Sequence, residues 1–584
     1  MRPVKLALIT AAVFAAPAAA SPPPIAEPVE VGTGGAVATV DPYASRAALG
    51  VLRNGGNAVD AAVAGLAALG VVEPYSTGIG GGGFMLIRTA AGKVTTIDGR
   101  ETAPASMQPD SLIDPATGSP YPFSVSATSP IAVGVPGALR AWEYALRKYG
   151  TRSFRTLLKP AIRLATDGFE FDNTLAQQTK DNLARFRDFT STAALYLTPD
   201  GQVPAPGTVL KNPGLAATLQ SVADGGADAF YSGPIADDIA ATVQHPPLRE
   251  GAGRRLVAGG MTAADIAAYQ PVERAPTHVS YRGRDVYGMG PPSSGGSTIG
   301  EALNILSGFG PAPTDRVSAL HAYMEASALA YADRNAYLGD PAFTPVPLCG
   351  LLSSPFADAR RATITGTAAH RPVAAGDPAP FNGGCGATGR AAAASPSHEG
   401  LSTSHLTVAD KHGNVVSATF TIEQIGGTAI TVPGRGILLN NELTDFDTAT
   451  GRPNSPQAGK RPRSSMAPTI VTRAGKPVFA VGSPGGATII TTVLQILVEK
   501  IDLRKSLAAA IEAPRISDRN GAAAEAEPDF MVAPARTDLE ARGHVFTQNP
   551  EIGAATGIEF LSGHRLRAIA EARRRGGGSA MALP

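Results

Sequence analysis

Two threonines at the two ends of a β-like stretch have the chemistry and the spacing of a reacting pair. Residues 404–422, SHLTVA-DKHGN-VVSATFTI, alternate as a half-buried hairpin does. If the turn is centred on His412, Thr403 faces Thr421 and two hydroxyl groups meet across the strands. Threonine is also simply a good strand residue. The pairing therefore needs support from elsewhere in the chain.

The elements that must position these threonines alternate between helices and strands. The spacing of apolar residues predicts helices at 43–53, 57–70, 137–149 and 317–338, and a hairpin of 84–88 with 94–97. Residues 341–402 instead are crowded with Pro, Gly, Ala and Ser, which is typical of a loop or linker. This segment runs straight into the threonine hairpin, and such a junction is a natural place for a cut in the chain.

The composition describes a large globular chain and excludes some classes of function. A length of 584 residues indicates two domains or one large layered domain, and 43% hydrophobic with 17% charged residues can bury a large core. The 50 basic and 49 acidic residues give a net charge of +1, and no basic run is longer than Arg573–Arg575. The electrostatic signature of a nucleic-acid-binding protein is therefore missing, and small molecules are the more fitting partners.

The beginning of the chain has the layout of a secretory signal peptide. Arg2 and Lys5 precede an apolar run that is too short to span a bilayer, and an A-x-A sequence ends at Ala20. Residues 1–20 are therefore predicted to be removed, which places the mature protein in the periplasm or outside the cell without a membrane anchor. The two cysteines, Cys349 and Cys385, are predicted to form a disulfide in that oxidising compartment. The absence of CxxC, HExxH and His-rich motifs predicts no metal, and no cofactor is implied.

Ordered motifs along nearly the whole mature chain resemble one enzyme family. The string LSTSHLTVADKHGNVVSATFT (401–421) is similar to the start of the small subunit of the gamma-glutamyltranspeptidases, which are N-terminal-nucleophile hydrolases. Further matches, in the family's order, are NGGNAVDAA (54–62), GGGGFML (80–86), GRETAP (99–104), PSSGGS (292–297), DRNAYLGDP (333–341), ILLNNELTDF (437–446), KRPRSSMAPT (460–469) and GSPGGATIITTVLQ (482–495). Each motif alone is weak, but their joint occurrence is highly specific.

The resemblance implies an α+β fold with four layers, αββα, built from a precursor that cuts itself between Ser402 and Thr403. The large subunit would be residues 21–402 and the small, catalytic subunit residues 403–584, and the two would form a heterodimer.

The resemblance also assigns the chemistry to the small subunit. Thr403 would be the nucleophile, because its freed α-amine, with an ordinary pKa near 8, can accept the hydroxyl proton. Thr421 would hydrogen-bond the Thr403 hydroxyl and hold its rotamer. Gly485 and Gly486, at the entrance to a helix, would donate their amides to the developing oxyanion.

A pocket for an amino-acid zwitterion is implied in the same way. Arg100 can grip an α-carboxylate through two parallel hydrogen bonds, shared with the hydroxyls of Ser464 and Ser465. The acids at the family's positions for the α-amino group are Glu423, Glu442 and Asp445. The implied donors are glutathione or related γ-glutamyl amides, and the acyl group would pass to water or to an amino acid or peptide.

Departures from the family leave alternatives open. The short segment between Asp445 and Ser464 indicates that the loop that covers the site in some relatives is reduced, which predicts a more open pocket. A glutaryl- or cephalosporin-type acylase of the same architecture would suit such a pocket. A periplasmic amino-acid-binding protein could use the same Arg100 clamp without any cut at Thr403. The glycines of 78–83 fit a dinucleotide-binding motif literally, but a helix precedes them and a strand follows, the reverse of the required order.

Overall fold

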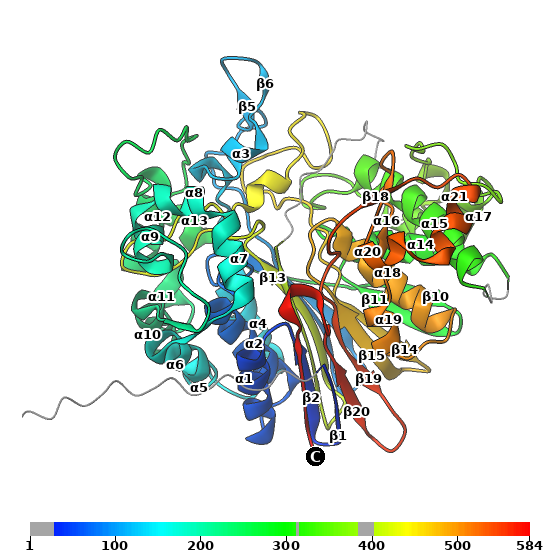
Figure 1. The fold of residues 1–584 in the computed structure, drawn as a ribbon, viewed down its shortest axis with the longest axis horizontal. Helices are drawn as coiled ribbons and strands as arrows, with labels where there is room; N and C mark the ends of the chain where they lie inside the picture. The colour runs from blue at the N-terminus through cyan, green and yellow to red at the C-terminus, as the bar shows by residue number, and fades with distance from the viewer. Residues whose placement is uncertain (1–27, 311–314, 384–401) are drawn as a thin grey trace, which may run out of the picture.

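The structure is a computed structural model, and it describes residues 28–310, 315–383 and 402–584 (Figure 1). The predicted signal peptide and Cys385 lie outside the described residues, so the signal peptide and the disulfide with Cys349 remain predictions. Within the described part of the chain, no helix combines the length and the apolar character needed to cross a membrane.

Two seven-stranded antiparallel sheets lie face to face at the centre of the molecule (Figure 1). The first sheet contains, in spatial order, β1 (Val29–Gly32), β20 (Leu566–Ile569), β19 (Thr556–Phe560), β15 (Lys476–Gly482), β14 (Thr469–Arg473), β11 (Arg284–Gly288) and β10 (Thr277–Tyr281). The second contains β21 (Ser579–Leu583), β2 (Gly35–Thr39), β12 (Ser404–Asp410), β13 (Val415–Thr421), β3 (Gly82–Arg88), β4 (Val94–Gly99) and β9 (Val272–Arg274). Small apolar side chains fill the space between the sheets, among them Ala36, Ala480 and Ala568.

Helices cover the outer face of each sheet (Figure 1). The layer on the second sheet contains α1 (Pro42–Arg53), α2 (Ala58–Val72), α4 (Ala138–Tyr149), α5 (Phe154–Leu157), α6 (Lys159–Asp167), α7 (Asn173–Asp181), α8 (Leu183–Asp188), α9 (Thr190–Tyr196), α10 (Pro213–Gly225), α11 (Asp228–Tyr231), α12 (Pro234–Gln244) and α13 (Ala263–Ala268). The layer on the first sheet contains α14 (Gly295–Ser307), α15 (Arg316–Tyr337), α16 (Leu348–Leu351), α17 (Ser354–Arg361), α18 (Thr488–Ile501), α19 (Leu507–Glu512), α20 (Pro528–Met531) and α21 (Pro534–Ala541). The order of layers is αββα, which confirms the predicted fold class.

Smaller elements complete the chain. They are β5 (Ile113–Asp114) with β6 (Ser119–Pro120), α3 (Phe123–Ser126), β7 (Phe169–Phe171) with β8 (Thr208–Leu210), and the sheet of β16 (Ile516–Ser517), β17 (Ala524–Ala526) and β18 (Phe546–Gln548).

The predicted helices and the first hairpin are present with ends that differ by a few residues. Local signals explain this agreement: Asp41 caps α1, and Asn57 with Asp60 forms a capping box at the start of α2. The predicted linker is partly wrong, because residues 341–383 include the helices α16 and α17. Leu351 and Phe356 bury their side chains there in a small separate core, which folds this part of the segment.

The threonine hairpin lies in the middle of the second sheet, in the predicted register. Ser404 pairs with Phe420, so the next pair outward is Thr403 with Thr421. Asp410 closes the turn by accepting hydrogen bonds from the backbone N–H groups of two turn residues, at 2.9 and 3.0 Å. β13 pairs with β3 as far as Thr421, so the threonine end of the hairpin is supported on that side. On the other side, β12 pairs with β2 from Leu406 onward.

Candidate active site

A small cleft opens where the threonine end of the hairpin meets the start of α18. The predicted site residues that line it are Arg100, Thr403, Thr421, Glu423, Glu442, Asp445, Ser464, Ser465 and Gly486. Met466 and Ile489 complete the wall. The structure therefore collects in one place residues that are more than 380 positions apart at the extremes of the sequence.

The two threonine hydroxyls are joined by a hydrogen bond. Thr403 Oγ1 donates to Thr421 Oγ1 at 3.1 Å, and the backbone N–H of Glu423 donates to the same Thr421 oxygen at 2.9 Å. Both threonine side chains are buried. Thr421 is thus placed to fix the rotamer of Thr403.

The backbone of Thr403 has an unusual conformation for a β-branched residue. Its φ is +118°, in a region that side chains with a branched Cβ rarely adopt. A conformation of this kind costs on the order of 1–3 kcal/mol and persists only where surrounding contacts hold it. Arg575 supplies such a contact, because its guanidinium donates to the Thr403 carbonyl oxygen and to Ser76 Oγ, each at 2.6 Å.

Arg100 lies between two of the acids instead of standing opposite them. It forms ion pairs with Glu442 and Asp445, and it also donates to the carbonyl oxygens of Pro462 at 3.2 Å and Arg463 at 2.9 Å. These contacts use most of the N–H groups of the guanidinium. Arg100 thus contacts two of the acids directly, and its bidentate grip on a substrate carboxylate stays a prediction.

Glu423, the third acid of the cleft, and Glu101, the residue after Arg100, have different surroundings. Glu423 accepts a hydrogen bond from the side-chain amide of Asn441, and its own φ is +79°. Glu101, next to Arg100, is fully buried, and neither of its carboxylate oxygens has a hydrogen-bond partner among the described residues. Burial raises the pKa of Glu101 to about 8, against the opposing effect of Arg100. At neutral pH Glu101 is therefore mainly protonated and adds little charge to the site.

The two serines present hydroxyl groups whose oxygens are already used as acceptors. Ser465 Oγ accepts from Arg334 at 2.8 Å, and Ser464 Oγ accepts from the backbone N–H of Met466 at 3.2 Å. Arg334 is itself held by Ser294 Oγ at 2.8 Å. The hydrogen of each serine hydroxyl can therefore be donated to a carboxylate in the cleft.

The two glycines stand at the entrance of α18 with φ values of +129° for Gly485 and +54° for Gly486. Both values lie in the region that glycine adopts without steric cost. Gly486 lines the cleft, whereas Gly485 lines an adjoining pocket together with Ile425 and Arg575. The end of the helix dipole adds a partial positive charge at this position.

The short segment after Asp445 is folded back by hydrogen bonds. Asn454 donates to the Asp445 carbonyl oxygen at 2.7 Å, and Lys460 donates to the carbonyl oxygens of Pro453 and Ser455. Asp445 is only 6% exposed and Thr403 only 4%. A cleft more open than that of some relatives stays a prediction.

Three residues of the site were missed by the sequence reasoning. Arg334 belongs to the motif DRNAYLGDP (333–341), which by itself assigns it no role, and Arg575 stands out in the sequence only as part of a basic run. Glu101 directly follows Arg100 in the GRETAP motif, which was the one available signal for it. The contacts of Arg334 and Arg575 could not be predicted, because they join distant parts of the chain.

The fold and the cleft together define a class of protein. An αββα sandwich with a hydroxyl-bearing residue just before a central strand, and that hydroxyl in a cleft, is the architecture of N-terminal-nucleophile hydrolases. The sequence pattern of one family of this class, the gamma-glutamyltranspeptidases, matches residues 44–581.

Known proteins resemble the chain over nearly its whole length. It is 40% identical over 554 residues to the glutathione hydrolase proenzyme of Bacillus subtilis, covering 94% of this chain and 92% of the relative. It is 37% identical over 544 residues to the acylase ACY 1 proenzyme of a Pseudomonas species, covering 91% and 90%. The crystal structure of a cephalosporin acylase from Bacillus halodurans superimposes with a TM-score of 0.83 at 30% identity, covering 97% of this chain and 99% of that chain. The chain therefore belongs to the gamma-glutamyltranspeptidase family, and the predictions of this family and of an enzyme are confirmed.

Proposed function

We propose that this protein is a gamma-glutamyl transferase and hydrolase that acts on glutathione and related γ-glutamyl amides, after cutting its own chain between Ser402 and Thr403. The observation that carries the proposal is the single cleft that holds the Thr403 hydroxyl beside a network of acids, Arg100 and two serines. The name of the Bacillus subtilis relative, a glutathione hydrolase proenzyme, supports both the substrate class and the precursor. The signal-like residues 1–20 support export from the cytoplasm.

The cut would be an intramolecular acyl shift. Thr403 Oγ1 attacks the carbonyl carbon of Ser402, the peptide C–N bond breaks, and the Thr403 nitrogen takes the hydroxyl proton. Water then hydrolyses the resulting ester, which leaves a carboxylate on Ser402 and a free amine and hydroxyl on Thr403. The positive φ of Thr403 supports this step, because the cut releases a strained backbone.

The two products would stay together as a heterodimer of residues 21–402 and 403–584. In the second sheet β12 and β13, from the small subunit, lie between β2 and β3 of the large subunit. In the first sheet, strands of the small subunit lie between β1 and β11 of the large one. Separation would break main-chain hydrogen bonds in both sheets, so a cut chain remains one particle.

Recognition of the donor would rest on charge. Glu423, Glu442 and Asp445 line the cleft, and their negative charge would attract a substrate ammonium. The hydroxyls of Ser464 and Ser465 would donate to the α-carboxylate. Arg334, behind Ser465, adds a positive charge on that side.

The reaction itself would use the freed amine of Thr403 as the internal base. The amine takes the hydroxyl proton while Oγ1 bonds to the γ-carbonyl carbon, and Gly485 and Gly486 offer their amides to the oxyanion. The C–N bond of the donor then breaks, and the leaving amine takes the proton from the Thr403 ammonium. Water or the amine of an amino acid or peptide attacks the ester in the same way and restores Thr403.

A glutaryl- or cephalosporin-type acylase is the second candidate, because the cephalosporin acylase structure covers nearly the whole chain. A glutaryl donor has no α-ammonium, so it would not make the favourable charge contact with Glu423, Glu442 and Asp445 that a γ-glutamyl donor makes. The two functions therefore differ in one measurable preference.

The test measures both the cut and the preference. Thr403→Ala should remain one chain and be inactive, whereas wild type and Thr403→Ser should yield fragments of about 39 and 19 kDa, in proportion to their lengths. On the same preparation, kcat/KM should favour a γ-glutamyl anilide over the glutaryl anilide by about a hundredfold or more. Asp445→Asn should shrink that ratio chiefly by lowering kcat/KM for the γ-glutamyl donor, and Asp538→Asn, far along the chain in α21, should not change it.

Three kinds of result would contradict the proposal. A Thr403→Ala chain that is still cut at this bond would remove Thr403 from the mechanism. Equal rates for the two anilides, or a preference for the glutaryl one, would favour the acylase. An active wild type that stays whole would point to an unprocessed enzyme or to a binding protein with a contaminating activity.

A further inference from the structure

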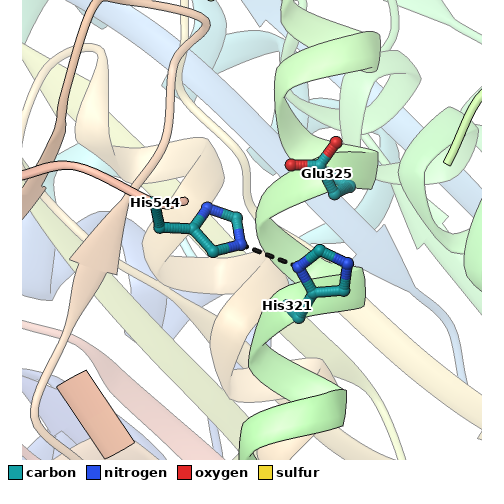
Figure 2. Close-up of side chains that lie close together, drawn as sticks. All are labelled: His321, Glu325 and His544. Carbon is teal, nitrogen blue, oxygen red and sulfur yellow. Dashed lines mark hydrogen bonds between the residues drawn. The ribbon is translucent and has the colours of Figure 1, made fainter. Parts of the chain in front are cut away.

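Away from the cleft, three buried side chains with metal-ligating chemistry converge between α15 and the segment after α21 (Figure 2). His321 and Glu325 are one turn apart on α15 and share a face of that helix. His544 approaches the same point from the chain that follows α21. Their ligand atoms all lie within 4.8 Å of one another, and no other such group of three was found in residues 28–310, 315–383 and 402–584.

The two histidines are oriented by hydrogen bonds that leave one nitrogen of each facing the other. His321 Nε2 contacts the Thr365 carbonyl oxygen at 2.8 Å, and a carbonyl only accepts, so this nitrogen carries the hydrogen. His321 Nδ1 then has a lone pair, which points at His544 Nε2 at 2.8 Å (Figure 2). A ring N–H donated to a backbone carbonyl is the arrangement that usually orients a histidine ligand.

The carboxylate is oriented in a similar way. Arg371 donates to Glu325 Oε1 at 2.7 Å, while Oε2 has only a longer contact of 3.3 Å with a backbone N–H. Arg371 also pairs with Asp518, so this arginine and its two acids together carry one negative charge. That charge offsets Arg542, the other cation near His544. The surroundings therefore tolerate an added cation.

We propose that His321, Glu325 and His544 form a binding site for a late first-row divalent metal ion, Zn²⁺ being the best match. Two imidazoles and one carboxylate suit Zn²⁺ and its neighbours, and they suit Ca²⁺ or Mg²⁺ poorly because those ions prefer oxygen ligands. The ion takes the place of the hydrogen between the two rings. His544 remains neutral, with its proton on Nδ1 instead of Nε2.

The two ring nitrogens need to move little to hold the ion, whereas the carboxylate oxygen, which lies within 4.8 Å of both, has to move closer. Tetrahedral coordination with Zn–N bonds of about 2.0–2.1 Å separates the two nitrogens by roughly 3.3 Å, about half an ångström more than their present distance.

The ligands come from both sides of the proposed cut. His321 and Glu325 lie in residues 21–402 and His544 in residues 403–584, so the ion would join the two subunits. This consequence rests on the proposed function, whereas binding of the ion does not. The sequence reasoning predicted no metal, because an H-x-x-x-E spacing on a helix and one distant histidine match none of the usual metal motifs.

The experiment uses the full mature protein, stripped with a chelator, given Zn²⁺ and desalted. Wild type should retain about one zinc per 21–584 unit, and Co²⁺ should give the visible absorption of a four- or five-coordinate ion. His544→Gln should retain none, because glutamine keeps an N–H near the same place but is a poor ligand. His278→Gln is the matched control: it removes a half-exposed histidine paired with Asp285, where an adventitious ion would bind, and should behave as wild type.

Each remaining outcome is decisive. No retained zinc in wild type, or equal retention in His544→Gln, would overturn the site. If His544→Gln does not fold, Glu325→Gln is tested in its place. This variant should weaken zinc binding at least tenfold, because it loses the anionic ligand. Unchanged zinc binding in Glu325→Gln would overturn the site. Zinc should raise the urea concentration that separates the two wild-type subunits. Thr403→Ala should bind zinc as wild type does, because the metal site does not depend on the cut. If wild type binds zinc but is never cut, the proposed cleavage is refuted and the metal site stands.

Discussion

Replacing Thr421 by valine should slow the cut at Thr403 while preserving the packing of the strand. The Thr421 oxygen accepts two hydrogen bonds, from the Thr403 hydroxyl at 3.1 Å and from the Glu423 N–H at 2.9 Å. Valine has nearly the same shape but no acceptor, so both buried donors lose their partner at about 1–3 kcal/mol each. If roughly 2 kcal/mol of this is lost where Thr403 must react, cleavage slows about thirtyfold.

The assay follows the precursor and the two fragments on denaturing gels after a short pulse of synthesis. Thr421→Ser is the matched control, since it keeps the oxygen and removes only the methyl group, and it should cleave within about threefold of wild type. Wild-type speed in Thr421→Val would refute the reasoning that this oxygen holds the nucleophile. A Thr421→Ser precursor as slow as Thr421→Val would show that the methyl packing matters and the oxygen does not.

Three further predictions concern stability. Burial lowers the pKa of His405 from 6.5 to about 3. The stabilising contribution of neutral His405 is therefore complete above pH 6.5 and is lost as the pH falls toward 3. His405→Gln should flatten the acid side of a plot of melting temperature against pH. The pH dependence of the Glu101 contribution has the opposite sign, because the pKa of Glu101 is raised from 4.5 to about 8. Its contribution to stability is complete below pH 4.5 and is lost as the pH rises toward 8. Glu101→Gln should therefore stabilise the protein above pH 7 and change its stability little near pH 5. Curves for either variant that run parallel to wild type would contradict these assignments. Gly482→Ala should lower the melting temperature markedly, because the added Cβ would lie 2.2 Å from the His405 ring; an unchanged melting temperature would show that the ring can move aside.

The elements and the hairpin register could be predicted because their signals are local. The caps of α1 and α2 lie beside the helices that they start, and the register of β12 with β13 follows from one turn. Thr403 opposite Thr421 is a consequence of that turn alone. By contrast, the helices α16 and α17 were missed, because a Pro- and Gly-rich composition hides the few apolar side chains that fold this segment.

The site residues could be named from motifs, but their partners could not. The motifs name Arg100, for example, but not its ion pairs with Glu442 and Asp445, which lie more than 340 positions later in the sequence. The length of the loop after Asp445 likewise does not reveal that Asn454 bonds back to the Asp445 carbonyl.

By itself, the sequence determined the family, the order of the elements and the identity of most of the residues that line the cleft, because residue type and short-range spacing carry that information. Tertiary structure alone decided which charges neutralise each other, why Thr403 is held at a positive φ, and which histidines meet. Arg575 reaches the Thr403 carbonyl across 172 positions, and His544 reaches His321 across 223. Contacts at such separations depend on how two sheets and two helical layers pack, and no local pattern in the chain records that packing.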